Sequence, residues 1–311
     1  MSDIAWRDFG KIENCQRLQK YLDGREYGHN DYCHYSTLKV LNNILASREI
    51  WLSPVSGFND AEDSRVFKER EKEHYYSFCI ATGKNENLPL WYMYAAMDKC
   101  NKCDKCDMSG ECNKADKDNK GGRIRLAKGS IKRLSKECKL ALCEKIRDEK
   151  GKNIKLRKIA DLKKDENVEL RFQDVLYYKE EAGKISLKYN TMTNYIVSPA
   201  EFEKYKEQNL GFYKDLIWFY EKETRLLAKI DDDLIKGYDA DKLVVTLNIA
   251  SIVNKIKIEL APDIDNVEDI LQNEEYPAIK EFFISNSSLQ LSEHHGKVRF
   301  RQNHNLNMKT C

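Results

Sequence analysis

The chain has 311 residues, of which 41% are hydrophobic and 33% are charged, and its formal net charge is +2. This composition can build a hydrophobic core and is not that of an intrinsically disordered chain. No stretch reaches the roughly 18 apolar residues that span a bilayer, and the first residues lack the basic and apolar regions of a signal peptide. We therefore expect a cytoplasmic protein that has no membrane partner.

The spacing of apolar and turn residues predicts strands mixed with helices along the whole chain. In the first half we expect strands at 33–35, 50–52, 75–82 and 123–126, helices at 38–45 and 61–73, and a buried strand or helix at 90–94. In the second half we expect a helix from Ser130 through Ile146 that stops at Gly151, strands at 168–178, 226–230, 243–247 and 256–260, and helices at 198–209 and 267–282.

We interpret these elements as one α+β core domain over residues 1–295. A cysteine-rich insert occupies residues 98–120 within it, and residues 296–311 form a tail. No internal repeat or low-complexity linker divides the chain.

Charge is distributed unevenly. Residues 120–164 contain 17 Lys and Arg against 5 Asp and Glu, a local charge of +12 in a chain whose total is +2. Such a basic segment can bind phosphates, nucleic acid or an acidic partner. The alternative is a solvated, lysine-rich helix face without a ligand.

The strongest chemical signal is a group of four closely spaced cysteines, Cys100, Cys103, Cys106 and Cys112. In a reducing compartment, thiols at such spacing indicate a metal site more than disulfides. Four thiolates satisfy tetrahedral zinc and leave no position for a catalytic water, so the zinc would be structural. An iron–sulfur cluster and unliganded, reactive thiols are the alternatives.

Several motifs occur in an order that resembles a bacterial family of domains of unknown function, and this family looks like the ADP-ribosyltransferase fold. The resemblance covers roughly residues 30 to 290, and the cysteine insert interrupts it. The motifs are Tyr32–Thr37, Ile50–Ser53, Phe58–Asp60, Leu90–Tyr94 continuing into Gly122–Arg125, and Trp218–Arg225.

This resemblance implies a split, mainly antiparallel sheet that is flanked by helices and binds NAD as a substrate. Carried over by position, His34 would contact the ribose, and Tyr35 or Tyr94 would stack on the nicotinamide. Ser53 and Asn59 are candidates for the second core-strand motif, and Asp60 is a further candidate for binding the substrate.

Two glutamates would carry the chemistry. Glu223 would stabilise the positive charge that develops on the ribose as the glycosidic bond breaks, which is the task of a carboxylate in glycosidases. Glu221 would orient the acceptor. If both lie on one strand, their Cα atoms are about 6.8 Å apart on the same face.

The first functional hypothesis is therefore an ADP-ribosyltransferase or NAD glycohydrolase, with a role as a toxin or phage-defence effector that acts on nucleic acid or protein and is held silent by a regulatory protein. The second is a nucleic-acid-binding module with a structural zinc site. The third is a nuclease that uses His34, Asp60 and Glu223 as acid–base groups.

Overall fold

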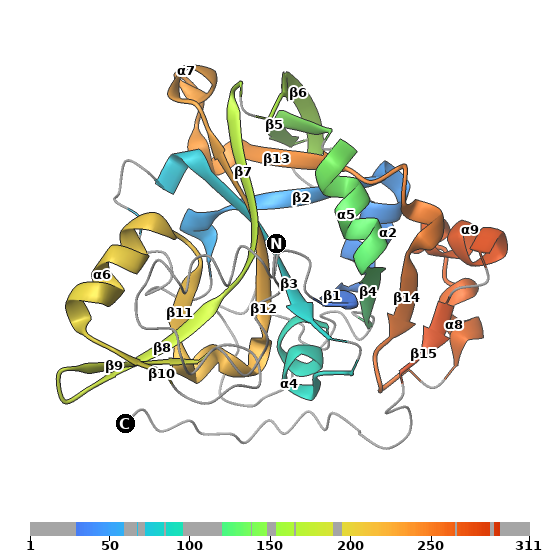
Figure 1. Cartoon of the computed structure of the whole chain (residues 1–311). Coiled ribbons are helices and arrows are strands. Elements are labelled where there is room, and N and C mark those ends of the chain that lie inside the picture. Colours follow the sequence, from blue (N-terminus) through green and yellow to red (C-terminus); the bar gives the residue numbers. More distant parts are fainter. Residues whose placement is uncertain are drawn as a thin grey trace, which may run out of the picture. The chain divides into compact units, whose positions relative to one another are not determined.

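The computed structural model describes residues 29–58, 67, 72–83, 85–95, 120–137, 139–147, 154–164, 166–188, 195–264, 266–286 and 289–292 (Figure 1). The chain forms two compact units. Unit 1 comprises Met1–Cys33, Arg48–Lys84 and Leu126–Lys255, and unit 2 comprises His34–Ser47, Asn85–Arg125 and Ile256–Cys311. Both contain strands together with helices, and the strands of unit 1 pair mostly antiparallel, so the predicted α+β class is confirmed at this level.

The main sheet of unit 1 is centred on β3, which buries Tyr76, Phe78 and Ile80 on one face and Ser77 on the other. β3 pairs with β2, with β12 and with the first residues of β1, and β12 pairs in turn with β7. On the other side, β2 continues through β13 and β5 to β6. All these pairs are antiparallel. The bounds are β1 Asp31–Thr37, β2 Glu49–Pro54, β3 Tyr75–Thr82, β5 Leu140–Arg147, β6 Ile154–Leu162, β7 Val168–Asp174, β12 Glu223–Ile230 and β13 Leu243–Asn248.

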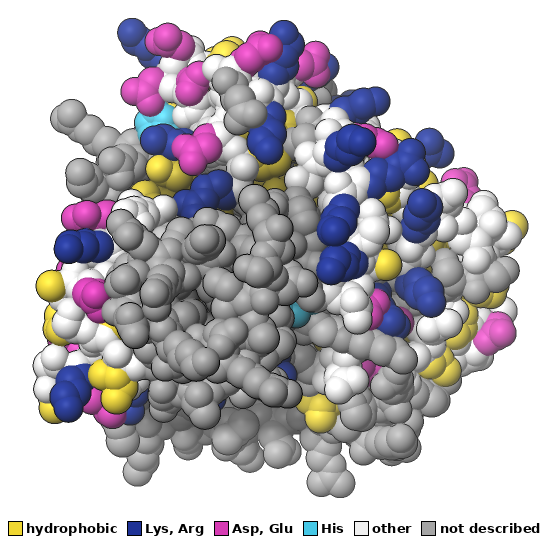
Figure 2. Space-filling view, viewed as in Figure 1, with side chains coloured by type: hydrophobic (Ala, Val, Ile, Leu, Met, Phe, Trp, Pro, Cys, Tyr) yellow, Lys and Arg dark blue, Asp and Glu magenta, His cyan; other side chains and the backbone are white. Residues whose placement is uncertain are grey.

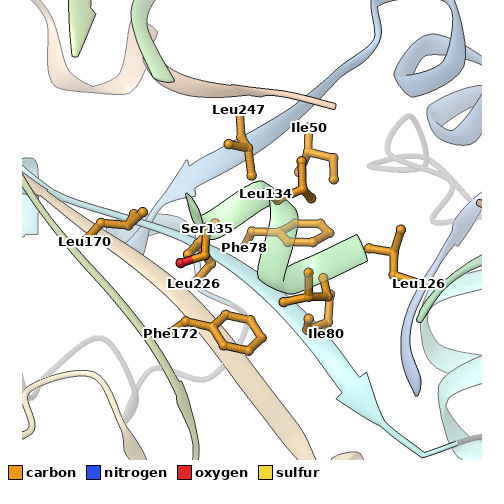
Figure 3. A pocket seen from close by; sticks show the side chains of 11 residues that line it. Ile50, Phe78, Ile80, Leu126, Leu134, Ser135, Leu170, Phe172, Leu226 and Leu247 are labelled. Atoms are coloured by element: carbon orange, nitrogen blue, oxygen red, sulfur yellow. The ribbon is translucent and has the colours of Figure 1, made fainter. Parts of the chain in front are cut away.

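A helix packs on one face of this sheet. α5 (Lys128–Glu137) buries Ile131 and Leu134, which line an apolar pocket together with sheet residues such as Phe78 and Leu226 (Figure 3). The prediction of a helix from Ser130 through Ile146 is wrong, because α5 ends at Glu137 and β5 begins at Leu140. Residues 140–147 pair with β6 and residues 140–144 also pair with β13, and these ladders outweigh the helical spacing of the local sequence.

Unit 1 also contains a smaller sheet of order β10-β9-β8-β11. The predicted strand at 168–178 is divided between the two sheets, because Val175 leaves β7 and its N–H donates to the carbonyl of Glu223. The helix predicted at Ser198 is confirmed, and the Ser198 hydroxyl accepts from the N–H of Glu201. The bounds are β8 Leu176–Glu181, β9 Lys184–Lys188, β10 Tyr195–Val197, β11 Tyr213–Asp215, α6 Pro199–Gln208 and α7 Asp232–Ile235, with 3-10 turns at Val55–Gly57, Lys72–His74, Leu216–Glu221 (η5), Ala240–Lys242 and Val253–Lys255.

Unit 2 has the strand order β15-β14-β4-β1, to which β1 contributes its last residues. α2 packs against α9, and the side-chain oxygen of Asn42 accepts from the N–H groups of Ala278 and Ile279. The predicted final helix is two helices, α8 and α9, and the segment predicted as strand or helix at 90–94 is helical. The bounds are α2 Leu38–Ser47, α4 Leu88–Leu90, the π-helix η4 Trp91–Ala95, β4 Gly121–Ala127, β14 Lys257–Leu260, α8 Val267–Leu271, α9 Pro277–Asn286 and β15 Leu289–Leu291.

Several predictions lie outside the described residues: the cysteine-rich insert, the tail and most of the helix at 61–73. Among the residues that the structure describes, no helix is both long enough and apolar enough to cross a membrane.

Candidate functional site

The two predicted carboxylates flank a sharp turn in unit 1. η5 ends at Glu221, Lys222 adopts a left-handed conformation with φ of 45°, and β12 begins at Glu223. The expectation that both glutamates lie on one strand face is therefore wrong, because the chain turns between them. The backbone N–H and the hydroxyl of Thr82 both donate to the carbonyl of Lys222, at 2.9 and 3.0 Å, which ties this turn to the end of β3.

The turn nevertheless brings the two carboxylates to one ammonium group. Lys214 Nζ donates to Glu221 Oε2 at 2.8 Å and lies 3.6 Å from Glu223 Oε2. The three side chains are 6 to 8% exposed. Lys214 comes from β11 of the smaller sheet, so this meeting of charges depends on how β11 and β12 are arranged within unit 1.

Glu223 is also held by a guanidinium group on its own strand. Arg225 donates from Nε to Glu223 Oε1 at 2.7 Å and from Nη2 to Oε2 at 3.0 Å, while its Nη1 donates to the carbonyl of Gly211 at 2.8 Å. The Arg225 side chain is 1% exposed. We define these four residues, Lys214, Glu221, Glu223 and Arg225, as the glutamate cluster, which contains two negative and two positive groups.

The cations keep Glu223 ionised. Burial alone would raise the pKa of the Glu223 carboxyl, but Arg225 and Lys214 outweigh it and lower this pKa to about 2. The same carboxylate adds to the effect of burial on its neighbours and raises the pKa of the Cys79 thiol and of the Tyr177 hydroxyl. The cluster therefore presents a permanently charged carboxylate at neutral pH, with neutral polar groups beside it.

Each cation of the cluster lies near an aromatic ring. The Arg225 guanidinium lies 5.0 Å from the centre of the Phe58 ring, and Lys214 Nζ lies 4.7 Å from the Trp218 ring. The Tyr177 hydroxyl accepts from the backbone N–H of Glu223 at 2.9 Å. These contacts hold the charged groups in place without adding further charge.

The predicted ribose-binding residues belong to unit 2. His34 is half-buried in β1, and Tyr94 is half-buried in the π-helix η4. Tyr35 is buried, and its hydroxyl accepts from Arg123 Nη1 at 2.8 Å and from the N–H of Asn87 at 3.0 Å. The Tyr35 and Trp91 rings pack edge to face, with 4.9 Å between their centroids.

Sequence reasoning missed the charges around Tyr35. Arg123 is completely buried, donates to Glu259 from Nε at 2.5 Å, and lies 4.0 Å from Glu86. Glu86 accepts from the indole N–H of Trp91 at 2.9 Å and from the Ser292 hydroxyl. Arg123 belongs to the Gly122–Arg125 motif, but its contact with Glu259 exists only because β4 pairs with β14, so no local pattern in the sequence could have indicated that contact.

The remaining predicted site residues are separate from these clusters or lie beyond the described part of the chain. Ser53 is exposed on β2, opposite Ser77 of β3. Asn59, Asp60 and the four cysteines Cys100, Cys103, Cys106 and Cys112 lie outside the described residues. Within the described ranges, no group of three or more His, Cys, Asp and Glu side chains could hold a metal ion.

A second polar group lies on the opposite face of β12. Asp174 accepts from Thr224 Oγ1 and lies 2.7 Å from His29 Nε2. Because side chains alternate along a strand, Thr224 points away from the face that carries Glu223 and Arg225. His29 and Asp174 were not predicted, since they are far apart in sequence and neither belongs to a motif.

The apolar pocket lies on the same face as Thr224. Phe78, Phe172 and Leu226 line it from the sheet, and α5 closes another side (Figure 3). Ser135 supplies the polar atom among the lining residues, and none of them is charged. A pocket without charged groups does not suit a dinucleotide, so we do not place NAD there.

Comparison with known proteins adds no assignment: no family model, no curated protein and no solved structure matches this chain.

Proposed function

We propose that the chain cleaves the bond between nicotinamide and ribose in NAD and passes ADP-ribose to an acceptor or to water. The observation that carries the proposal is that Glu221 and Glu223, the two carboxylates expected from the sequence, both lie against Lys214 at the start of β12. A role as a toxin or phage-defence effector belongs to the same proposal.

In this reaction the electron pair of the C1′–N bond leaves with nicotinamide, and positive charge develops on the ribose. An ionised carboxylate stabilises that charge. The lowered pKa of Glu223 supports this role, because the group remains ionised throughout the physiological pH range. An acceptor oxygen then bonds to C1′ and loses its proton, and Glu221 orients that oxygen.

The fixed orientation of the Glu223 carboxylate also supports the proposal. Both oxygens of Glu223 accept hydrogen bonds from Arg225, which fixes the orientation of the carboxylate. Fixed groups stabilise a transition state without having to reorganise during the reaction. By resemblance, His34, Tyr35, Tyr94 and Asp60 would bind the nucleotide, and Ser53 and Asn59 remain candidates for the second motif.

The test is release of nicotinamide from NAD by the purified chain, followed by chromatography with and without cellular RNA, DNA and protein. Glu223→Gln is expected to lower the rate by at least about a hundredfold, as the loss of an electrostatic stabiliser does elsewhere. Glu221→Gln is expected to reduce transfer to an acceptor more than hydrolysis.

The control is Asp174→Asn, which disturbs a partly buried carboxylate of β7 beside the other face of β12 and should retain nicotinamide release. Circular dichroism would verify that each variant is folded at the assay temperature. If the wild-type chain releases no nicotinamide under any of these conditions, or if folded Glu223→Gln releases it at the wild-type rate, the proposal is wrong.

A further inference from the structure

Most of the exposed charged side chains of α5 are basic. Lys132, Arg133 and Lys136 are exposed on the helix, and Lys139 is exposed directly after it. The acidic side chain of this helix, Glu137, already accepts from Arg133 Nε at 2.7 Å. Figure 2 shows the resulting concentration of Lys and Arg side chains over α5.

Some cations of the basic segment at 120–164 are neutralised by ion pairs and others are not. On the neighbouring hairpin, Arg157 pairs with Glu144, and Lys158 pairs with Asp161. In contrast, Lys132, Lys136 and Lys139 form no salt bridge with any residue that the structure describes. Lys145, Arg147 and Lys155 of the hairpin likewise form no salt bridge within the described residues, so α5 stands out because its lysines form one row along a helix.

This arrangement of charges does not stabilise the helix. Lys128, Lys132 and Lys136 follow one another at intervals of four residues, where like charges repel. No acidic residue occupies the first turn, and Lys128 places a cation at the end of the helix where the macrodipole disfavours it. A face that needed only solubility could carry mixed charges, as α6 does with its Lys206–Glu203 pair.

The surface extends beyond the helix. Intervals of four residues place the lysines about 6 Å apart along the axis, in a row that can follow successive phosphates. Leu140 pairs with Leu162, so the residues that flank this pair, Lys139 and Lys163, leave the β5–β6 ladder at the same end. Lys163 pairs with Glu166, whereas Lys164 is exposed and forms no ion pair within the described residues.

We infer that a basic surface consisting of Lys128, Lys132, Lys136, Lys139 and Lys164 binds the phosphate backbone of a nucleic acid strand. Lysine is a point charge that suits phosphate contacts, and such contacts position a strand without reading its sequence. Binding is therefore independent of sequence and strongly dependent on salt. The inference does not require the NAD reaction, since it concerns binding alone.

The experiment compares two triple variants of equal net charge. The first, Lys132→Gln/Lys136→Gln/Lys139→Gln, removes unpaired lysines from the basic surface. The matched control, Lys179→Gln/Lys206→Gln/Lys242→Gln, removes lysines of unit 1 that each pair with a neighbouring carboxylate. Fluorescence anisotropy with labelled single-stranded RNA and with DNA of the same sequence, at about 50 to 200 mM salt, measures affinity and its salt slope.

The wild-type chain is expected to bind, and the first variant to lose at least about tenfold in affinity at the lowest salt. Each lost phosphate contact lowers the slope of log K against log salt by about 0.7, so three contacts should reduce it by about 2. The control should resemble the wild type. Absence of wild-type binding, equal losses in both variants, or equally strong competition by polyglutamate would overturn the inference. A preference for RNA or for DNA would identify which nucleic acid is bound.

Discussion

Replacement of Glu223 by glutamine is expected to destabilise the fold by about 3 to 5 kcal/mol at neutral pH. The substitution preserves the shape of the side chain but leaves Arg225 and Lys214 with one carboxylate, Glu221, so a positive charge remains buried without compensation. The pKa gives a similar magnitude. A carboxyl whose pKa falls from 4.5 to about 2 on folding contributes about 3 kcal/mol when it is ionised.

The stabilisation that Glu223 provides is expected to decrease at acidic pH. Because the pKa of Glu223 is lower in the folded state, its contribution is fully present above pH 4.5 and is lost as the pH falls toward 2. The difference in unfolding free energy between wild type and Glu223→Gln should therefore be largest near pH 7 and should shrink near pH 3.

Urea unfolding followed by circular dichroism measures this difference at both pH values. A suitable control is Glu144→Gln, which removes the carboxylate of a more exposed ion pair with Arg157 and should cost no more than about 1 kcal/mol. A cost for Glu223→Gln as small as that of the control, or one that stays constant between pH 7 and pH 3, would refute the reasoning.

Two further predictions concern the backbone and the metal. Gly211 has a φ of 81°, and a Cβ atom there would lie 2.9 Å from the Phe67 ring and 3.1 Å from Leu227. Gly211→Ala should therefore lower the free energy of unfolding by more than about 1 kcal/mol. An unchanged urea midpoint would contradict this prediction. The four clustered cysteines predict about one zinc ion per chain by elemental analysis. Iron with visible absorption, or no bound metal in protein purified under reducing conditions, would contradict the zinc assignment.

Local chemistry made part of the fold predictable. The capping box at Ser198 specifies where α6 begins, because a side-chain hydroxyl satisfies an N–H group of the first turn. The run of aromatic and β-branched residues at 75–82 specifies a buried strand. The prediction of a helix at 130–146 failed where local spacing suited either structure and β13 and β6 provided strand partners for residues from 140 onward.

The candidate site divides in the same way. The sequence by itself determined that two carboxylates stand two residues apart beside an arginine, that four cysteines are closely spaced, and that positive charge is concentrated at 120–164. Only the tertiary structure decided that Glu221 and Glu223 meet Lys214, that Arg123 is buried against Glu259, and which lysines of the basic segment remain unpaired. The physical reason is that an ion pair depends on a few ångströms of separation, and strand pairing between distant segments sets that separation.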